Sequence, residues 1–182
     1  MIRFNPRLCK LKTCRARFIP KEPWEWWCCV EHMRAIAEQK RGAAWKQEKR
    51  ERLKALERVS DITARMKRKA QLCARLRDAA LGCISCGTFI ADEYHGGHFF
   101  PAHKHPLTRF DWRRNIHKQC KRCNKDLHGN LTDYRENLIA KIGAVAFAEL
   151  QELSKTTSYK HTREELAVIE DQLNADLKEL KA

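Results

Sequence analysis

Two Cys-x-x-Cys pairs, Cys83/Cys86 and Cys120/Cys123, constrain the fold of this 182-residue chain more than any other sequence feature. Four thiolates arranged as two close pairs are what a tetrahedral structural zinc requires. The 33 residues between the pairs exceed the span of a short zinc finger. We therefore expect a zinc-stapled module whose intervening segment carries a further function.

The charge and cysteine content limit the class of protein. The chain has 37 Lys and Arg against 23 Asp and Glu, a net charge of +14. This excess favours a polyanionic partner, most simply nucleic acid, with a membrane surface as the alternative. No apolar run approaches the roughly 20 residues of a membrane-spanning helix, and the N-terminus lacks the apolar core of a secretory signal. Nine cysteines without such a signal indicate metal binding in a reducing compartment, so we expect a cytoplasmic protein.

A second cysteine cluster is predicted in residues 1–40. This segment is too short and too poor in periodic apolar residues to fold alone, which is when a small module needs a metal. The predicted zinc ligands are Cys9, Cys14, Cys28 and His32, and Cys29 could replace Cys28 as a ligand. The alternative is that these cysteines are free buried thiols beside a surface histidine.

Residues 41–81 are predicted to form a basic helical arm. Apolar residues from Leu53 to Ala80 recur at spacings near three, four and seven, which indicates one apolar helix face. Between Lys40 and Arg77 there are 14 basic residues and four acidic ones. Such density favours sequence-independent phosphate contacts, although a solvated face, a helical hairpin or a dimer seam would also fit. The expected DNA contacts of this arm are Arg50, Arg52, Lys67 and Arg68.

Residues 82–130 hold the candidate chemical site. His98 lies in a strand-like aromatic segment, Asn115 follows a basic loop, and Asn124 comes directly after the last cysteine. A helix beginning at the last cysteine pair would place Asn124 and His128 on one face, because they are four residues apart. Further cations expected to contact DNA are Arg113, Arg114, Lys118 and Lys121.

Residues 131–182 are predicted to form a helical tail. Two apolar stripes are separated by a polar break, and Thr162 with Glu165 fits a capping box that opens the last helix. Ten acids and seven bases give this part a net charge of −3, so we do not expect it to be the main DNA surface. Its apolar stripe is expected to pack on the core or to form a dimer interface.

The central segment resembles the HNH, or ββα-metal, nucleases in its four-cysteine zinc, hairpin histidine and flanking asparagines. Its Cys-x-x-Cys-Asn form is similar to phage junction-resolving nucleases of the endonuclease VII type. The series GGHF, NIHxQCxxCN and DYRxxLxxKIG resembles still more closely the NinG (Rap) recombination proteins of lambdoid phages. The resemblance runs through most of the chain, including the N-terminal cysteines, and its core covers residues 83–143.

That family implies a structure-specific endonuclease in the host cytosol that cleaves Holliday junctions and other branched DNA during phage recombination, with Mg²⁺ or Mn²⁺ as the catalytic metal. Carried over by position, the resemblance makes His98 the general base, because a neutral imidazole can accept a proton near pH 7. Asn124 would ligate the divalent cation through its carbonyl oxygen. Asn115 would brace the loop that holds His98.

One position departs from the pattern. Many HNH enzymes have a metal-binding Asp immediately before the catalytic His, whereas this chain has Gly97. The second metal ligand must then come from another residue. We favour His128 because it is expected to face the same way as Asn124. The other candidates are Asp92, Glu93 and His95.

The sequence thus predicts a helix-rich α+β protein with a central zinc-stapled, HNH-like module, an N-terminal zinc module, a basic arm and C-terminal helices. A homodimer is expected, because a four-way junction offers two symmetric strands to cut. A less selective HNH nicking nuclease is the alternative enzyme. A zinc-containing recombination accessory protein that binds DNA without cutting it is the alternative outside catalysis.

Overall fold

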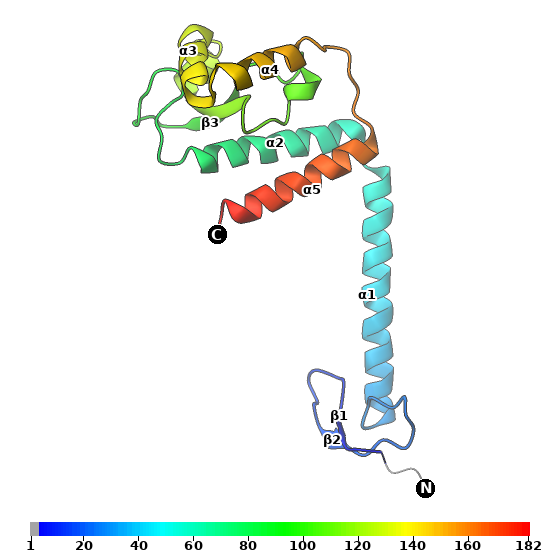
Figure 1. Cartoon of the computed structure of the whole chain (residues 1–182). Helices are drawn as coiled ribbons and strands as arrows, with labels where there is room; N and C mark the ends of the chain where they lie inside the picture. Colours follow the sequence, from blue (N-terminus) through cyan, green and yellow to red (C-terminus); the bar gives the residue numbers. More distant parts are fainter. Residues whose placement is uncertain (1–3) are drawn as a thin grey trace. The chain divides into compact units, whose positions relative to one another are not determined.

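The computed structural model describes residues 4–182, and these divide into two units at Glu57/Arg58 (Figure 1). The first unit contains a two-stranded antiparallel sheet followed by one long helix. Its elements are β1 (Arg7–Leu8), β2 (Arg17–Phe18) and α1 (Val30–Leu56). The division therefore lies inside the predicted arm and not at residue 40 or residue 81.

Helix α1 has no buried residue, and every residue from 38 to 56 is exposed. The segment contains no proline and a single glycine, so nothing in it interrupts a helix. The helix ends at Glu57, whose ψ of 132° is extended. The predicted apolar stripe is divided by this break: Leu53 and Leu56 are 60% and 78% exposed, whereas Ile62, Met66 and Cys73 on the following helix are buried.

The second unit is built around a β-hairpin covered by helices. Strands β3 and β4 pair antiparallel, with Tyr94 opposite Cys120 and His98 opposite Ile116. A two-stranded sheet is marginal alone and needs helices packed against it. The strands are β3 (Tyr94–His98) and β4 (Ile116–Cys120), and the helices are α2 (Val59–Arg77), η1 (Pro106–Thr108), the π-helical turn η2 (Arg122–Asp126), α3 (Leu131–Ile142), α4 (Ala144–Ser154) and α5 (Arg163–Glu179).

Two apolar clusters hold this unit together. Helices α2 and α5 lie side by side in Figure 1, and both contribute to a core that includes Met66, Cys73, Ile116 and Leu166. The position of Cys73 on the apolar stripe predicts a core residue and not a metal ligand, and its side chain is fully buried. A second cluster joins α3 to α4 around Tyr134. The predicted capping box at the start of α5 is also confirmed.

The prediction of a helix-rich α+β protein with small sheets is confirmed. Among the residues that the structure describes, no helix is both long and apolar enough to cross a membrane.

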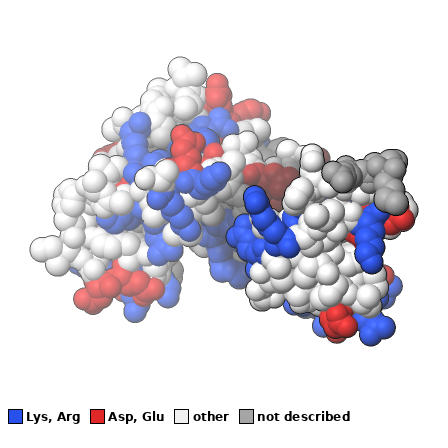
Figure 2. Space-filling view, turned by 90° about the horizontal axis from the view of Figure 1, so that it is seen from below, with Lys and Arg blue, Asp and Glu red and all other residues white. Residues whose placement is uncertain are grey.

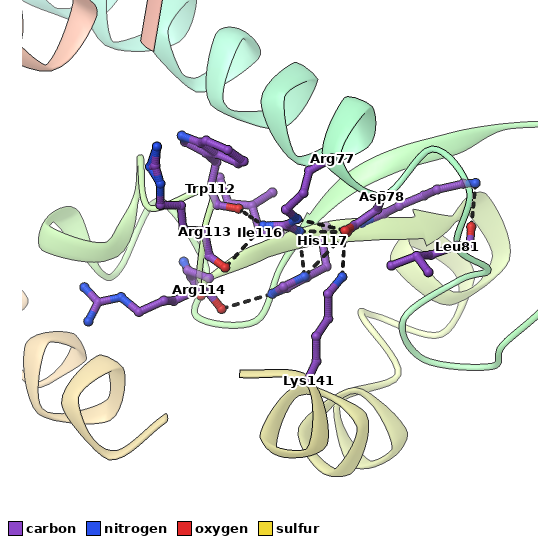
Figure 3. A network of polar contacts seen from close by, with 12 residues as sticks. Arg77, Asp78, Leu81, Trp112, Arg113, Arg114, Ile116, His117 and Lys141 are labelled. Carbon is purple, nitrogen blue, oxygen red and sulfur yellow. Dashed lines mark hydrogen bonds and ion pairs between the residues drawn. The ribbon is translucent and has the colours of Figure 1, made fainter. Parts of the chain in front are cut away.

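A buried carboxylate links α2, β4 and α3 (Figure 3). The side chain of Asp78, at the end of α2, is 1% exposed. It accepts hydrogen bonds from Arg77 at 2.7 and 2.8 Å, from Lys141 Nζ at 2.6 Å and from the backbone N–H of Lys118 at 3.1 Å. His117 Nδ1 lies 3.5 Å from the same carboxylate. From the sequence alone, His117 in its basic segment is predicted to be a surface or phosphate-contacting residue. This prediction is wrong, because its side chain is fully buried.

We expect Asp78→Ala to lower the free energy of unfolding by about 3–5 kcal/mol, because it removes a buried carboxylate and leaves the partly buried cations of Arg77 and Lys141 without their partner. Burial alone would raise the pKa of Asp78, but hydrogen bonds from Arg77, His117 and Lys141 overcome it and hold the pKa well below its usual value. The stabilisation is therefore present above pH ~4 and is lost as the pH falls further.

Urea denaturation at neutral and acid pH measures this effect, with Asp171→Ala as the control, since Asp171 is exposed on α5. Equal stability of the two variants at neutral pH would contradict the structural role of Asp78.

Candidate functional site

The central cysteine cluster forms as the spacing predicts. The sulfur atoms of Cys83, Cys86, Cys120 and Cys123 all lie within 4.8 Å of one another. Cys86 Sγ and Cys120 Sγ are 3.8 Å apart, close to the separation of about 3.8 Å that two thiolates have on a tetrahedral zinc. A disulfide needs about 2.05 Å, so these atoms are placed for a metal. The cluster could bind zinc.

The N-terminal cluster has the same character. Ligand atoms of Cys9, Cys14, Cys28 and His32 lie within 4.8 Å of one another, and Cys28 Sγ is 3.1 Å from His32 Nδ1. Cys29 instead occupies the N-cap position of α1, so Cys28 is the candidate ligand. Burial and the neighbouring thiols of Cys14 and Cys9 raise the pKa of Cys28 to about 12. A cation bound by this cluster would favour the thiolate forms of its cysteines.

Gly97 has no room for the aspartate found at this position in many HNH enzymes. A Cβ atom there would lie 2.1 Å from Oε1 and 3.0 Å from Cδ of Gln119. Gln119 is itself fully buried and donates from Nε2 to Ser85 Oγ and to the carbonyl of Gly129. The glycine is therefore favoured by close packing across the hairpin, which leaves position 97 without a side chain that could bind a metal.

The structure brings Asn124 against His95. Asn124 Nδ2 lies 2.8 Å from His95 Nδ1, and His95 Nε2 lies 2.9 Å from a carboxylate oxygen of Glu93. The amide can turn to present its oxygen in place of its nitrogen. Two adjacent ligands of an octahedral cation at about 2.1 Å stand about 3.0 Å apart. The observed separation is close to this value, so the Asn124–His95 pair could hold a divalent cation.

The geometry that favoured His128 as the second ligand is wrong. The helical turn that carries Asn124 ends at Asp126, and His128 follows in the left-handed region with φ 50°. The two side chains therefore do not share a helical face, and His128 is exposed. Of the candidates named from the sequence, His95 is the one in contact with Asn124.

His98 is half-buried at the end of β3 and its tautomer is set by a neighbour. Its Nε2 lies 3.1 Å from the carbonyl oxygen of Arg109, which requires the ring proton on Nε2 and leaves the lone pair on Nδ1. Burial, opposed by this hydrogen bond and assisted by the charges of Lys67 and Arg109, lowers the pKa of His98 to about 4. The ring is thus neutral at pH 7, with an unprotonated Nδ1.

Asn115 joins the segment after His98 to the far side of its loop. Its side chain is fully buried, with Oδ1 accepting from the Phe100 N–H at 2.8 Å. Its Nδ2 donates to the carbonyl oxygens of Phe100 and Thr108, both at 3.0 Å. All of its principal hydrogen bonds are made to backbone, so Asn115 positions the loop and does not itself face a substrate.

The hairpin does not bring His98 and Asn124 into one cluster. Successive side chains of a strand point to opposite faces, and His95 and His98 are three residues apart in an unbroken register. Their side chains therefore project from opposite faces of β3. Within residues 4–182, His98 and Asn124 share no hydrogen-bonding partner.

The predicted DNA-contacting cations fall into two groups. Lys118 donates to the carbonyls of Ala79 and Leu81, Arg114 pairs with Asp111 and Glu149, and Arg113 pairs with Asp176. These three side chains make contacts within the fold, and their contact with DNA stays a prediction.

The second group is open to solvent. Arg50, Lys67 and Arg68 are exposed, Arg52 pairs with Glu48 while 69% exposed, and Lys121 is 54% exposed and 3.8 Å from Glu93. Lys and Arg side chains are visible on both units in Figure 2. Lys67 is near enough to His98 to affect its pKa, which places a phosphate-attracting charge beside that imidazole.

Fold and site together define the class: a basic, helix-rich α+β protein with two four-residue clusters that could bind zinc. The chain belongs to the NinG family, because residues 1–182 match the family model described as Bacteriophage Lambda NinG protein. It is 34% identical to the protein ninG of Escherichia phage 933W, over 97% of this chain and 96% of that protein.

Two further relatives show the same extent of similarity. The protein ninG of Salmonella phage P22 is 35% identical, over 96% of this chain and 94% of the relative. The protein ninG of Escherichia phage lambda is 34% identical, over 96% and 93%. No solved structure matches the chain.

The sequence did not reveal the buried network around Asp78, and it did not single out His95 among the candidate metal ligands. Asp78 gives no motif, and only its position directly after the buried stripe of α2 hints that it faces the interior. His95 was visible as a histidine beside two glycines, but its contact with Asn124 depends on the hairpin register.

We expect two zinc ions per chain, with Cys28→Ser losing one of them and Cys29→Ser keeping both. The two cysteines are adjacent and both half-buried, but only Cys28 lies in the cluster. Metal analysis of the purified variants counts the ions. Equal zinc content in the two variants, or loss of zinc in Cys29→Ser alone, would contradict this ligand assignment.

Proposed function

We propose that this protein is a metal-dependent endonuclease that cleaves Holliday junctions and other branched DNA. The observation that carries the proposal is the contact of Asn124 with His95 directly beside a four-cysteine cluster. An amide oxygen and an imidazole held next to a rigid knuckle suit a hard or borderline divalent cation such as Mg²⁺ or Mn²⁺. A cation bound there would supply positive charge to the scissile phosphate and to the leaving oxygen.

The residues around this pair determine its orientation. Glu93 accepts from His95 Nε2, which would leave Nδ1 of the ring as the ligand atom that faces Asn124. Asn124 is fixed because it follows Cys123, whose sulfur belongs to the cluster. Both members of the pair are therefore positioned by the cysteine cluster. His95 follows Tyr94, which pairs with Cys120, and Asn124 follows Cys123 on η2.

His98 is the proposed general base. Its neutral ring, its accepting Nδ1 and the nearby Lys67 suit the removal of a proton from water beside a phosphate. Its projection from the face opposite His95 favours a second candidate, a zinc-containing recombination accessory protein that binds DNA without cutting it. The two candidates make different predictions for cleavage.

We expect His95→Ala and Asn124→Ala to abolish cleavage of a synthetic four-way junction in Mg²⁺ or Mn²⁺, and His98→Ala to slow it about 10²–10⁴-fold, as for loss of a general base. His128→Ala is the matched control and should cleave normally, because its side chain is exposed and away from Asn124. Binding to the junction is measured in parallel and should be kept by all four variants.

The outcomes separate the candidates. Cleavage unaffected by His98→Ala but lost in His95→Ala would leave the metal pair as the site and His98 as a structural residue. Equal cutting of linear duplex would favour the less selective nicking nuclease. Binding without cleavage by the wild type in either metal would establish the accessory protein and overturn the proposal.

DNA affinity is proposed to come from the exposed cations of α1 and α2. We expect reversal of Arg50, Arg52, Lys67 and Arg68 to Glu to weaken duplex binding and to flatten its salt dependence, because each lost phosphate contact removes about 0.9 from the log–log slope. Reversal of Lys178 and Lys181, in the acidic tail, is the control. An unchanged slope in the fourfold variant would mean that these side chains are only solvated.

A homodimer is also proposed, because a junction presents two strands to cut. The exposed apolar side chains of Leu53 and Leu56 on α1 offer one contact surface for it.

A further inference from the structure

The N-terminal unit carries an aromatic side chain surrounded by cations. The Trp26 ring is 46% exposed, with the Arg7 guanidinium 4.5 Å and the Lys10 ammonium 5.5 Å from its centroid. Arg7 is held there by hydrogen bonds to the carbonyl oxygens of Pro23, at 2.7 Å, and Glu25, at 3.3 Å. The indole is thus fixed by a stacked guanidinium while much of its surface stays open.

A pocket of about 490 Å³ lies beside this ring. Three of its lining residues are cations and none is acidic. The lining consists of Leu8, Cys9, Lys10, Lys12, Arg15 and Trp26. Lys10, Lys12 and Arg15 are exposed, so their charges are available to a ligand.

The nearby acids are directed away from this pocket. The Glu25 carboxylate accepts from the backbone N–H groups of Lys21 and Glu22, and so closes its own turn. Neither Glu22 nor Glu25 lines the pocket. The pocket therefore presents positive charge and an aromatic surface together.

The N-terminal cysteine cluster makes this surface rigid. Lys10 follows Cys9, Arg15 follows Cys14, and Trp26 precedes Cys28 by one intervening residue. The backbone N–H of Lys10 also donates to the Trp26 carbonyl at 2.8 Å. The backbone that carries Lys10, Arg15 and Trp26 is thus held next to the cluster, which limits its loss of conformational freedom on binding a ligand.

We propose that the Trp26 pocket binds unpaired nucleotides, with a base stacked on the indole and the adjoining phosphates held by Lys10, Lys12 and Arg15. Aromatic platforms in a cationic groove are how proteins bind single-stranded nucleic acid without reading its sequence. Base pairs inside a duplex offer no free face to an indole, so the ring discriminates unpaired from paired strands. This inference goes beyond the proposed cleavage and does not depend on it.

The test measures binding of the full-length, zinc-loaded chain to a labelled oligothymidylate and to a blunt duplex, without Mg²⁺ or Mn²⁺. Trp26→Ala should weaken binding of the single strand about 5- to 150-fold, the usual range for loss of one stacking contact, and leave duplex binding unchanged. Trp26→Phe should keep most of the affinity. Trp45→Ala is the matched control, since Trp45 is 59% exposed on α1 and lies outside the pocket.

Zinc content shows whether each variant keeps its fold. If Trp26→Ala loses zinc, the proposal is tested with the double variant Lys10→Gln, Lys12→Gln. This variant should reduce the slope of log K against log salt concentration for single-strand binding by up to about 1.4. Single-strand binding unchanged in that double variant, or a fall in duplex binding equal to the fall in single-strand binding, would overturn the proposal. Failure of cleavage would appear instead in the His95 and Asn124 variants, so the two proposals fail separately.

Discussion

The four thiols of Cys83, Cys86, Cys120 and Cys123 are the constraint on which the rest of the central module depends. Cys120 ends β4 opposite Tyr94, so whatever joins the sulfurs also fixes the end of the hairpin that carries His95. A two-stranded sheet of five residues per strand is marginal by itself. A metal held by these sulfurs would therefore contribute directly to folding. It would also stabilise the hairpin end at which His95 contacts Asn124.

A second constraint acts on the same hairpin. The Asp78 carboxylate joins α2 to β4 and, through Lys141, to α3. Buried charges cost several kcal/mol each unless they are fully paired, so this network is stable only with all its members present. The cysteine cluster fixes the position of the hairpin end, and the carboxylate fixes the helices on the hairpin.

The parts of the structure that were predictable from the sequence are local ones. Cysteine spacing gave both metal clusters, and the Thr162–Glu165 pattern gave the start of α5. What failed depended on contacts distant in sequence. The interior position of His117 follows from the partner at Asp78, 39 residues earlier, and the position of His128 follows from a turn with φ 50° that no periodicity reveals. The selection of His95 as the candidate metal ligand beside Asn124 depended on the strand register, which the sequence leaves undetermined.

Strand alternation has a consequence for any chemistry on this hairpin. In a chain with an aspartate directly before the histidine, the two side chains would point to opposite faces of the strand, and they could meet only where the strand ends or twists. Here the packing of Gln119 against Gly97 removes that option. In the proposed site the metal ligand would instead be His95, which lies two residues before Gly97, on the same face of β3, and contacts Asn124 of η2. The ligand would then be a different residue on the same face of the strand. This is the reason that a missing aspartate at position 97 does not by itself exclude a metal-dependent nuclease.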